Sequence, residues 1–226
     1  MTELALNMPS TKIRSLNVPD AHSANPSTLL GLRMVALALI LLAAVPSAAA
    51  AHSGTGLAGG FLSGVEHPLS GPDHMLAMIA VGLWGAFLGR PLMIALPVIF
   101  PNMMAIGAGI GMAGVPLPPV ELGIALSVLI LGLMILFAVR APVLVACAVV
   151  AMFGLFHGYS HGLELPSAAD PIGYATGFVL CTGLLHVAGI ALGSLRTLRF
   201  GNAGLRVGGG VIAACGLFFL VRVQGL

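Results

Sequence analysis

Residues 92–113 read LMIALPVIFPNMMAIGAGIGMA, an apolar run without a single charged side chain. Such a run is long enough to cross a bilayer, since a transmembrane helix needs about 20 predominantly apolar residues. The whole chain shares this character: 9 of its 226 residues are Lys or Arg, 7 are Asp or Glu, and its mean hydropathy is +1.08. A soluble domain carries about 25% charged residues. The composition therefore indicates a membrane protein, and it excludes a soluble globule and a disordered chain.

Five further apolar runs resemble the first in length. They are continuous and do not alternate with polar residues, so they predict helices and not the strands of a barrel. The expected fold is all-α, a polytopic membrane helix bundle of six transmembrane helices plus a short re-entrant segment or half-helix over residues 54–66. The predicted spans are 73–89, 92–113, 119–139, 142–160, 172–194 and 204–222. Small residues spaced by four, as in Gly154-x3-Gly158-x3-Gly162, predict close helix packing.

The N-terminal region has the features of a targeting segment. A polar stretch with basic residues leads into the apolar core 34–45, which is followed by Pro46 and a row of small residues. This pattern predicts a cleavable signal peptide with cleavage after Ala51. Residues 1–51 are therefore expected to be leader and signal peptide, and residues 52–226 a single transmembrane domain. The mature chain would begin at His52, whose amine and imidazole can ligate one metal ion, although His52 equally well merely follows the cleavage site.

The few charges are sorted between the two ends of the predicted helices. Basic residues occupy alternate loops: Arg90, Arg140, Arg196, Arg199 and Arg206. Acidic residues fall at the other end: Glu66, Asp73, Glu121, Glu164 and Asp170. The positive-inside rule makes the Arg-containing loops cytoplasmic. We expect a multi-pass protein of the bacterial inner membrane with its mature N-terminus outside, and an acidic outer mouth that attracts cations.

Candidate metal ligands are concentrated in two segments, and the first is Glu66-His67-Pro-Leu-Ser-Gly-Pro-Asp73-His74. Its prolines and glycine oppose a continuous helix, so the chain is expected to turn and bring His67 back toward Asp73 and His74. Met78 follows His74 by four residues, which places a thioether one turn below the imidazole. We predict His67, Asp73 and His74 as metal ligands and add Glu66 and Met78 as further candidates.

The second segment is Phe156-His157-Gly-Tyr-Ser-His161-Gly-Leu-Glu164, at the outer end of the fourth predicted span. His157, His161 and Glu164 have i, i+4, i+7 spacing and share one helix face. Two imidazoles and a carboxylate on one face suit a divalent transition metal. Helices interrupted by Gly or Pro in both halves of a chain are also typical of a transporter site. We therefore predict His157, His161 and Glu164 as metal ligands.

One histidine, His186, lies inside a predicted span. Ionisable residues there are rare and costly, which favours a functional role. His186 is either an inner ligand for an ion or a structural group that bonds a backbone carbonyl or Thr182. The cysteines lie singly in apolar runs, so neither a disulfide framework nor a cysteine zinc site is expected. They are Cys147, Cys181 and Cys215.

The two histidine segments resemble the two signature motifs of the HupE/UreJ family. The first motif matches at His67-x5-Asp73-His74, and the second at the Phe156–Glu164 segment quoted above. The resemblance also covers the signal peptide and the six spans, from about residue 34 onward. It implies a nickel (sometimes cobalt) permease that supplies hydrogenase or urease maturation. The positions carried over from the family are His67, Asp73, His74, His157, His161 and Glu164.

Two functions of different classes fit these observations. The first is a secondary permease, not an enzyme, that imports nickel or cobalt as its transported substrate and holds no permanent cofactor. No Walker A motif is present, which excludes intrinsic ATP drive. The second is an intramembrane metal-dependent hydrolase that uses a His/Asp zinc site with Glu164 as base. A haem-binding protein with paired histidines is a third alternative.

The expected partners follow from the same features. They are a divalent transition-metal ion and the lipid bilayer, and a homo-oligomer is compatible with the sequence. Nucleic-acid binding is not expected, because the net charge is only +2 and no basic patch occurs. The sequence does not identify the cytoplasmic recipient of the metal, and it does not separate nickel from cobalt, since both accept His and carboxylate ligands.

Overall fold

The computed structural model describes residues 57–117, 119–164, 170–198 and 201–225, and every regular element in these ranges is a helix. The elements are α2 (Leu57–Ser70), α3 (Pro72–Leu88), α4 (Leu92–Met112), α5 (Val120–Leu136), α6 (Val143–Glu164), α7 (Pro171–Ser194), the short 3₁₀ helix η2 (Leu195–Thr197) and α8 (Gly201–Val223). A helix is present at each of the six predicted spans, so the all-α prediction is confirmed. The predicted signal peptide and His52 lie outside the described residues.

The helices differ in whether they can cross a membrane alone. Among the described residues, α4, α6, α7 and α8 are long and apolar enough to do so. Helices α2 and α3 reach this length only as a pair, which is bent by 81°, and α5 has 17 residues. The helices are those of an integral membrane protein, and the number of six crossings stays a prediction.

The bend between α2 and α3 lies at Gly71. This residue is extended, with φ −92° and ψ 99°, and Pro72 is the first residue of α3. A residue before proline avoids the helical region, while proline itself suits the first position of a helix. Helix α2 continues through Pro68, which we had expected to help break it. The predicted turn is therefore confirmed, but it is confined to Gly71. The helix before it ends at Ser70, four residues after the expected end at residue 66.

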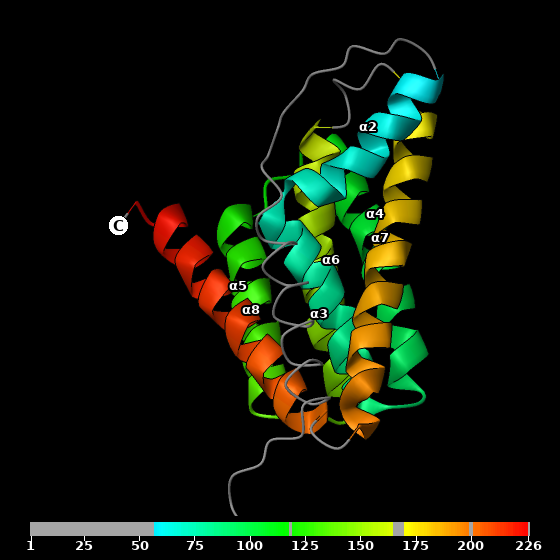
Figure 1. Ribbon diagram of the computed structural model, residues 1–226. Coiled ribbons are helices and arrows are strands. Elements are labelled where there is room, and N and C mark those ends of the chain that lie inside the picture. Colours follow the sequence, from blue (N-terminus) through cyan, green and yellow to red (C-terminus); the bar gives the residue numbers. More distant parts are fainter. Residues whose placement is uncertain (1–56, 118, 165–169, 199–200, 226) are drawn as a thin grey trace, which may run out of the picture.

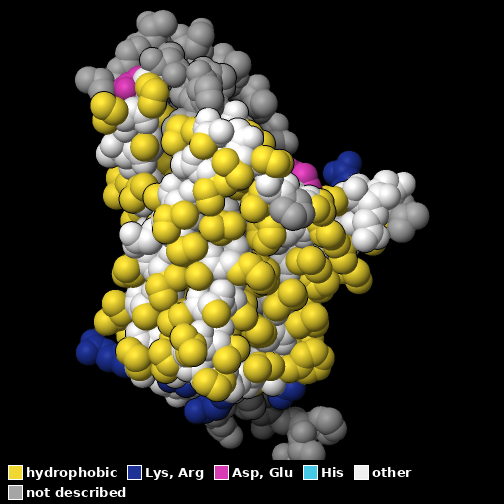
Figure 2. All heavy atoms as spheres, turned by 180° about the vertical axis from the view of Figure 1, so that it is seen from behind, with side chains coloured by type: hydrophobic (Ala, Val, Ile, Leu, Met, Phe, Trp, Pro, Cys, Tyr) yellow, Lys and Arg dark blue, Asp and Glu magenta, His cyan; other side chains and the backbone are white. Residues whose placement is uncertain are grey.

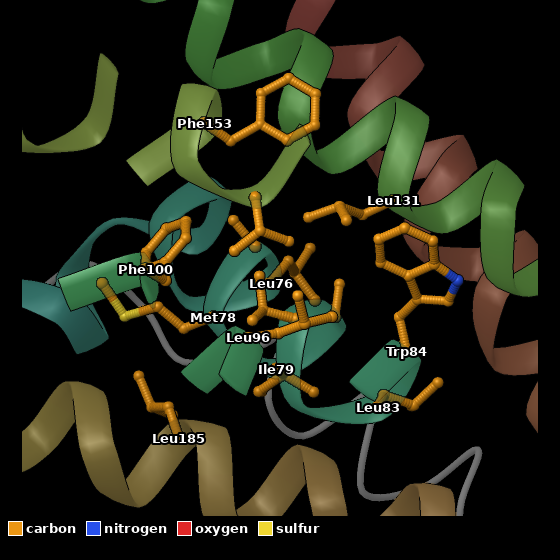
Figure 3. Packing of buried hydrophobic residues seen from close by; sticks show 14 of the residues in the cluster. Leu76, Met78, Ile79, Leu83, Trp84, Leu96, Phe100, Leu131, Phe153 and Leu185 are labelled. Atoms are coloured by element: carbon orange, nitrogen blue, oxygen red, sulfur yellow. The ribbon is translucent and has the colours of Figure 1, made fainter. Parts of the chain in front are cut away.

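Helix α3 lies at the centre of the bundle (Figure 1). All its residues from Met75 to Phe87 are buried, which agrees with a helix that is apolar on every side. Trp84, Leu96 and Phe100 pack in the core that surrounds it (Figure 3). Helices α7 and α4 contact α3, α2 packs on α7, α6 packs on α4, and α5 and α8 form a flanking pair. The core thus fixes α3 against the helices that carry the predicted site.

Glycines allow these helices to approach closely, as the small-residue spacing predicts. A methyl group on Gly158 of α6 would overlap the backbone of Met104 on α4, and one on Gly162 would overlap Ala108. The same relationship holds between α7 and α3, where Gly189 lies against the backbone of α3. Such contacts hold helices together by van der Waals packing. This packing is important in a membrane because lipid is as apolar as the helix surfaces, so the hydrophobic effect does not drive the helices together.

The outer surface of the bundle is apolar. Large side chains such as Leu144, Ile172 and Leu184 are exposed by 81%, 76% and 61%. Figure 2 shows apolar side chains over most of one face, with basic side chains at the lower end and a further basic patch higher up on the right. The loops after α3, α5 and α7 meet at one end of the bundle, so Arg90 and Arg140 lie at the same end (Figure 1). Arg222 lies at the other end of α8. An apolar belt with charges at its ends is the surface that a bilayer requires.

Candidate metal centre

Four imidazole rings meet where α2, α3 and α6 come together. We call His67, His74, His157 and His161 the outer cluster. The ring centroids of His67 and His161 are 4.8 Å apart. The ring centroid of His74 lies 4.7 Å from that of His161 and 4.9 Å from that of His157. His67 and His74 are 6.5 Å apart. The two sequence segments that we predicted to carry ligands are therefore joined in one site.

The fold brings these rings together through two local features. The bend at Gly71 turns α2 back over the N-terminal end of α3, so that His67 faces His74. On α6, His157 and His161 are one turn apart and point into the bundle, being 0% and 6% exposed. Gly158 and Gly162, which directly follow these histidines, face the backbone of α4. Because successive residues of a helix are about 100° apart, the imidazoles lie on the adjacent face of α6.

Asp73 orients the ring of His74. Asp73 Oδ1 lies 2.8 Å from His74 Nδ1 and also accepts a hydrogen bond from the backbone N–H of His74. An ionised carboxylate can only accept, so the ring proton is on Nδ1 and the lone pair is on Nε2. Nε2 of His74 is buried and has no hydrogen-bond partner in the described part of the chain. A carboxylate behind a histidine in this way is the usual second partner of a metal-ligating imidazole.

His157 is prepared in the same way by the backbone. Its Nδ1 donates to the carbonyl oxygen of Phe153 at 2.9 Å, which again leaves the lone pair on Nε2. That nitrogen is also buried without a partner in the residues that the structure describes. A buried polar atom without a partner is rare in proteins and requires an explanation. Binding of a transient ligand, such as a metal ion, is one explanation for this buried nitrogen.

Aromatic side chains that we had not predicted surround the outer cluster. The ring centroid of Phe178 on α7 lies 4.5 Å from that of His161. The ring centroid of Tyr174, one turn earlier on α7, lies 5.7 Å from that of His67. Phe100 of α4 lies 5.3 Å from His157. These rings give the imidazoles aromatic neighbours on α4 and α7. Their i, i+4 spacing on α7 is the sequence signal that could have identified Tyr174 and Phe178.

The remaining predicted ligands are placed differently. Glu66 is exposed, and Met78 is fully buried in the hydrophobic core. His186 is buried further along α7 and contacts Phe100, with ring centroids 5.5 Å apart. Glu164 ends α6, and its side chain, like His52, lies outside what the structure describes. Of the predicted set, the structure brings together the outer cluster and Asp73.

The rings of the outer cluster pack edge to face on one another. Within the described ranges, no group of three or more His, Cys, Asp or Glu side chains is already arranged to hold a metal ion. An ion bound by several of these imidazoles therefore requires the rings to rotate apart. Each ring of the cluster already has at least one other ring with its centroid within 5 Å.

The fold and the site define a helical membrane protein with a partly buried histidine cluster at one end of its bundle. The model of the HupE / UreJ protein family matches residues 38–219. The chain is also 47% identical over 178 residues to Protein HupE of Rhizobium leguminosarum bv. viciae, a match that covers 79% of this chain and 93% of that protein. No solved structure matches the chain. The chain belongs to the HupE/UreJ family.

Proposed function

We propose that the protein is a secondary permease that imports nickel or cobalt from the periplasm to the cytoplasm, for the maturation of hydrogenase or urease. The observation that carries this proposal is the outer cluster, where four imidazoles from three helices meet inside a membrane bundle. Neutral imidazole is a suitable ligand for nickel and its neighbours in the transition series. The buried Nε2 atoms of His74 and His157 have their lone pairs ready for an ion.

Family membership supports transport over catalysis. The HupE/UreJ family is associated with nickel accessory functions for hydrogenase and urease. The hydrolase alternative needs a general base beside a bound metal. Asp73 contacts the outer cluster, but its Oδ1 is engaged by the backbone N–H and the ring of His74. We therefore assign Asp73 the task of orienting an imidazole.

The predicted ligands would bind the ion firmly enough to capture it and weakly enough to release it. His67, His74, His157 and His161 replace part of the hydration shell of the ion, and Glu164 at the end of α6 adds a carboxylate. Mixed imidazole and carboxylate ligation holds an ion less firmly than a closed thiolate cage. A carrier needs this moderate affinity, because an ion that binds too tightly is not released.

The membrane potential can drive the import. The Arg-rich end of the bundle is taken as cytoplasmic and the end with the outer cluster as periplasmic. A doubly charged ion that moves inward gains about 4.6 kcal/mol per 100 mV, since each elementary charge contributes about 2.3. This free energy suffices for accumulation without a nucleotide-binding domain.

The proposal is tested by uptake of radioactive nickel into cells that lack other nickel importers. We expect His74→Ala to abolish accumulation while the variant inserts into the membrane at the level of the unmodified protein. The control is Ser127→Ala, which removes another buried polar side chain, on α5, whose hydroxyl donates to the carbonyl of Ile124. Accumulation that persists in His74→Ala would overturn the proposal.

A further inference from the structure

We propose that His186 and Thr182 form a second, inner metal-binding site that receives the ion from the outer cluster. This inference rests on the proposed transport function. The two residues are one turn apart on α7 and are 1% and 0% exposed. Both ring nitrogens of His186 and the hydroxyl of Thr182 lack a hydrogen-bond partner among the described residues. Three buried polar atoms without partners thus lie together on one face of a helix.

A structural histidine would be held differently, as His157 shows. On α6, Nδ1 of His157 donates to the carbonyl of Phe153, four residues earlier. On α7, the residue four positions before His186 is Thr182, and neither its hydroxyl nor its carbonyl is bonded by the ring. A helix therefore offers His186 the bond that His157 makes, and His186 does not make it. The ring remains available for a ligand that arrives from elsewhere.

Helix α7 connects the two sites by a single stripe of side chains. Tyr174, Phe178, Thr182 and His186 follow one another at intervals of four residues and are all buried. The first two contact the outer cluster, while the last two are polar. With a rise of 1.5 Å per residue, His186 lies about 12 Å beyond Phe178 along the helix. The inner site is thus deeper in the bundle than the outer cluster. Its two residues continue the row on α7 that begins with Tyr174 and Phe178.

The ring of Phe100 contacts an imidazole of each site. Its centroid lies 5.3 Å from that of His157 and 5.5 Å from that of His186. Phe100 is fully buried on α4, between Pro97 and Pro101, where the helix lacks two backbone donors. The same apolar ring thus borders both sites, and we expect it to turn when an ion passes from one to the other.

A cavity provides space beside this route. It has a volume of about 140 Å³ and lies between α4, α6 and α7. His161 of the outer cluster and Thr182 of the inner site both line it, together with Met104, Tyr174 and Phe178. The rest of its lining is mostly apolar, and Val179, which also lines it, is exposed on the outer surface of the bundle. The cavity therefore borders one residue of each site, His161 of the outer cluster and Thr182 of the inner site.

The chemistry of the inner site suits transfer. One imidazole and one hydroxyl supply few ligands, so water must complete the coordination of the ion. Such a site binds more weakly than the four-imidazole cluster and releases its ion more easily. A weak site beyond a stronger one permits the ion to move inward when the next ion arrives from outside.

The test compares nickel uptake kinetics of His186→Leu and Thr182→Val with those of the unmodified protein in proteoliposomes. We expect the maximal rate to fall roughly ten-fold or more in His186→Leu, and by a smaller factor in Thr182→Val. The half-saturating nickel concentration should stay unchanged in both, because capture at the outer cluster is intact. A loss of folding alone would lower the amount of reconstituted protein and leave the rate per molecule unchanged.

The matched control is Thr176→Val on the same helix. Thr176 is exposed and its hydroxyl donates to the carbonyl of Ile172, so its removal should leave uptake unaltered. Wild-type maximal rates in both His186→Leu and Thr182→Val would overturn the inner site, even where His74→Ala blocks uptake. If the unmodified protein itself carried no nickel, the transport function would fail and the inner site with it. The uptake of the unmodified protein therefore distinguishes failure of the transport function from failure of the inner site alone.

Discussion

Asp73 Oδ1 lies 2.8 Å from His74 Nδ1, and the same oxygen accepts the backbone N–H of His74 at 2.8 Å. Both bonds come from the residue that follows Asp73 at the start of α3. They fix the carboxylate and, through it, the orientation and tautomer of the imidazole. The ring held in this way has its centroid 4.9 Å from that of His157 and 4.7 Å from that of His161.

The substitution Asp73→Asn should weaken nickel capture. The amide keeps the size of the carboxylate but loses its charge, so it no longer fixes the tautomer of His74. Loss of such a partner typically costs 10–100-fold in metal affinity. We therefore expect the half-saturating nickel concentration to rise by roughly that factor in uptake measured over a range of nickel concentrations. An unchanged half-saturating concentration would show that Asp73 does not act through His74.

The positions of the helices could be predicted from the sequence alone. Each of the six apolar runs became a helix with ends close to the expected ones, because length and apolarity leave a membrane segment no other structure. The turn before Asp73 was also predicted, from Gly71 and Pro72. The sequence did not show that α2 continues through Pro68, because one proline removes only one helix bond and the packing of α2 on α7 compensates.

The convergence of the two histidine segments is a property of packing. Their residues are about ninety positions apart in the chain, and they meet because α6 lies on α4 and α2 lies on α7. A single sequence states which residues can ligate, but not which rings face one another. Phe100 was missed for the same reason, since phenylalanine in an apolar run gives no sign that it borders a site.

Uptake should decline in acidic medium. An imidazole ligates only when neutral, and its ordinary pKa is about 6.5. Protons therefore compete with nickel for the outer cluster, and we expect the initial uptake rate to fall as the external pH drops through about 6. The measurement is initial uptake at fixed free nickel and fixed membrane potential. A rate that is flat between about pH 7 and pH 5 would contradict a rate-determining role for the histidines.

The substitution Gly71→Ala should disturb the Asp73–His74 pair without unfolding the bundle. Its backbone conformation is open to alanine, but a methyl group there would lie 3.1 Å from His74 Nδ1 and 3.2 Å from Asp73 Oδ1. Both groups must shift to make room. We expect a higher half-saturating nickel concentration and a thermal unfolding midpoint close to that of the unmodified protein. A large drop in thermal stability with unaltered affinity would indicate that Gly71 serves the fold alone.

The substitution Gly158→Ala tests whether close packing of α6 on α4 holds the site in place. A methyl group at Gly158 would overlap the backbone of Met104, so the two helices must separate. Overpacking of this kind typically costs 1–3 kcal/mol. Because His157 is the neighbouring residue on α6, the displacement should also move its ring away from His74. We expect a lower thermal unfolding midpoint of the detergent-solubilised protein together with a reduced uptake rate.

Gly109→Ala on α4 is the matched control for this prediction. Its added methyl group would meet no atom within 4 Å. An alanine inside a helix is more stable than a glycine by roughly 0.5–1 kcal/mol, so this variant should be at least as stable as the unmodified protein. Its nickel uptake should be normal, because no helix has to move. Equal losses in Gly158→Ala and Gly109→Ala would mean that the effect comes from replacing any glycine, and not from the contact between α4 and α6.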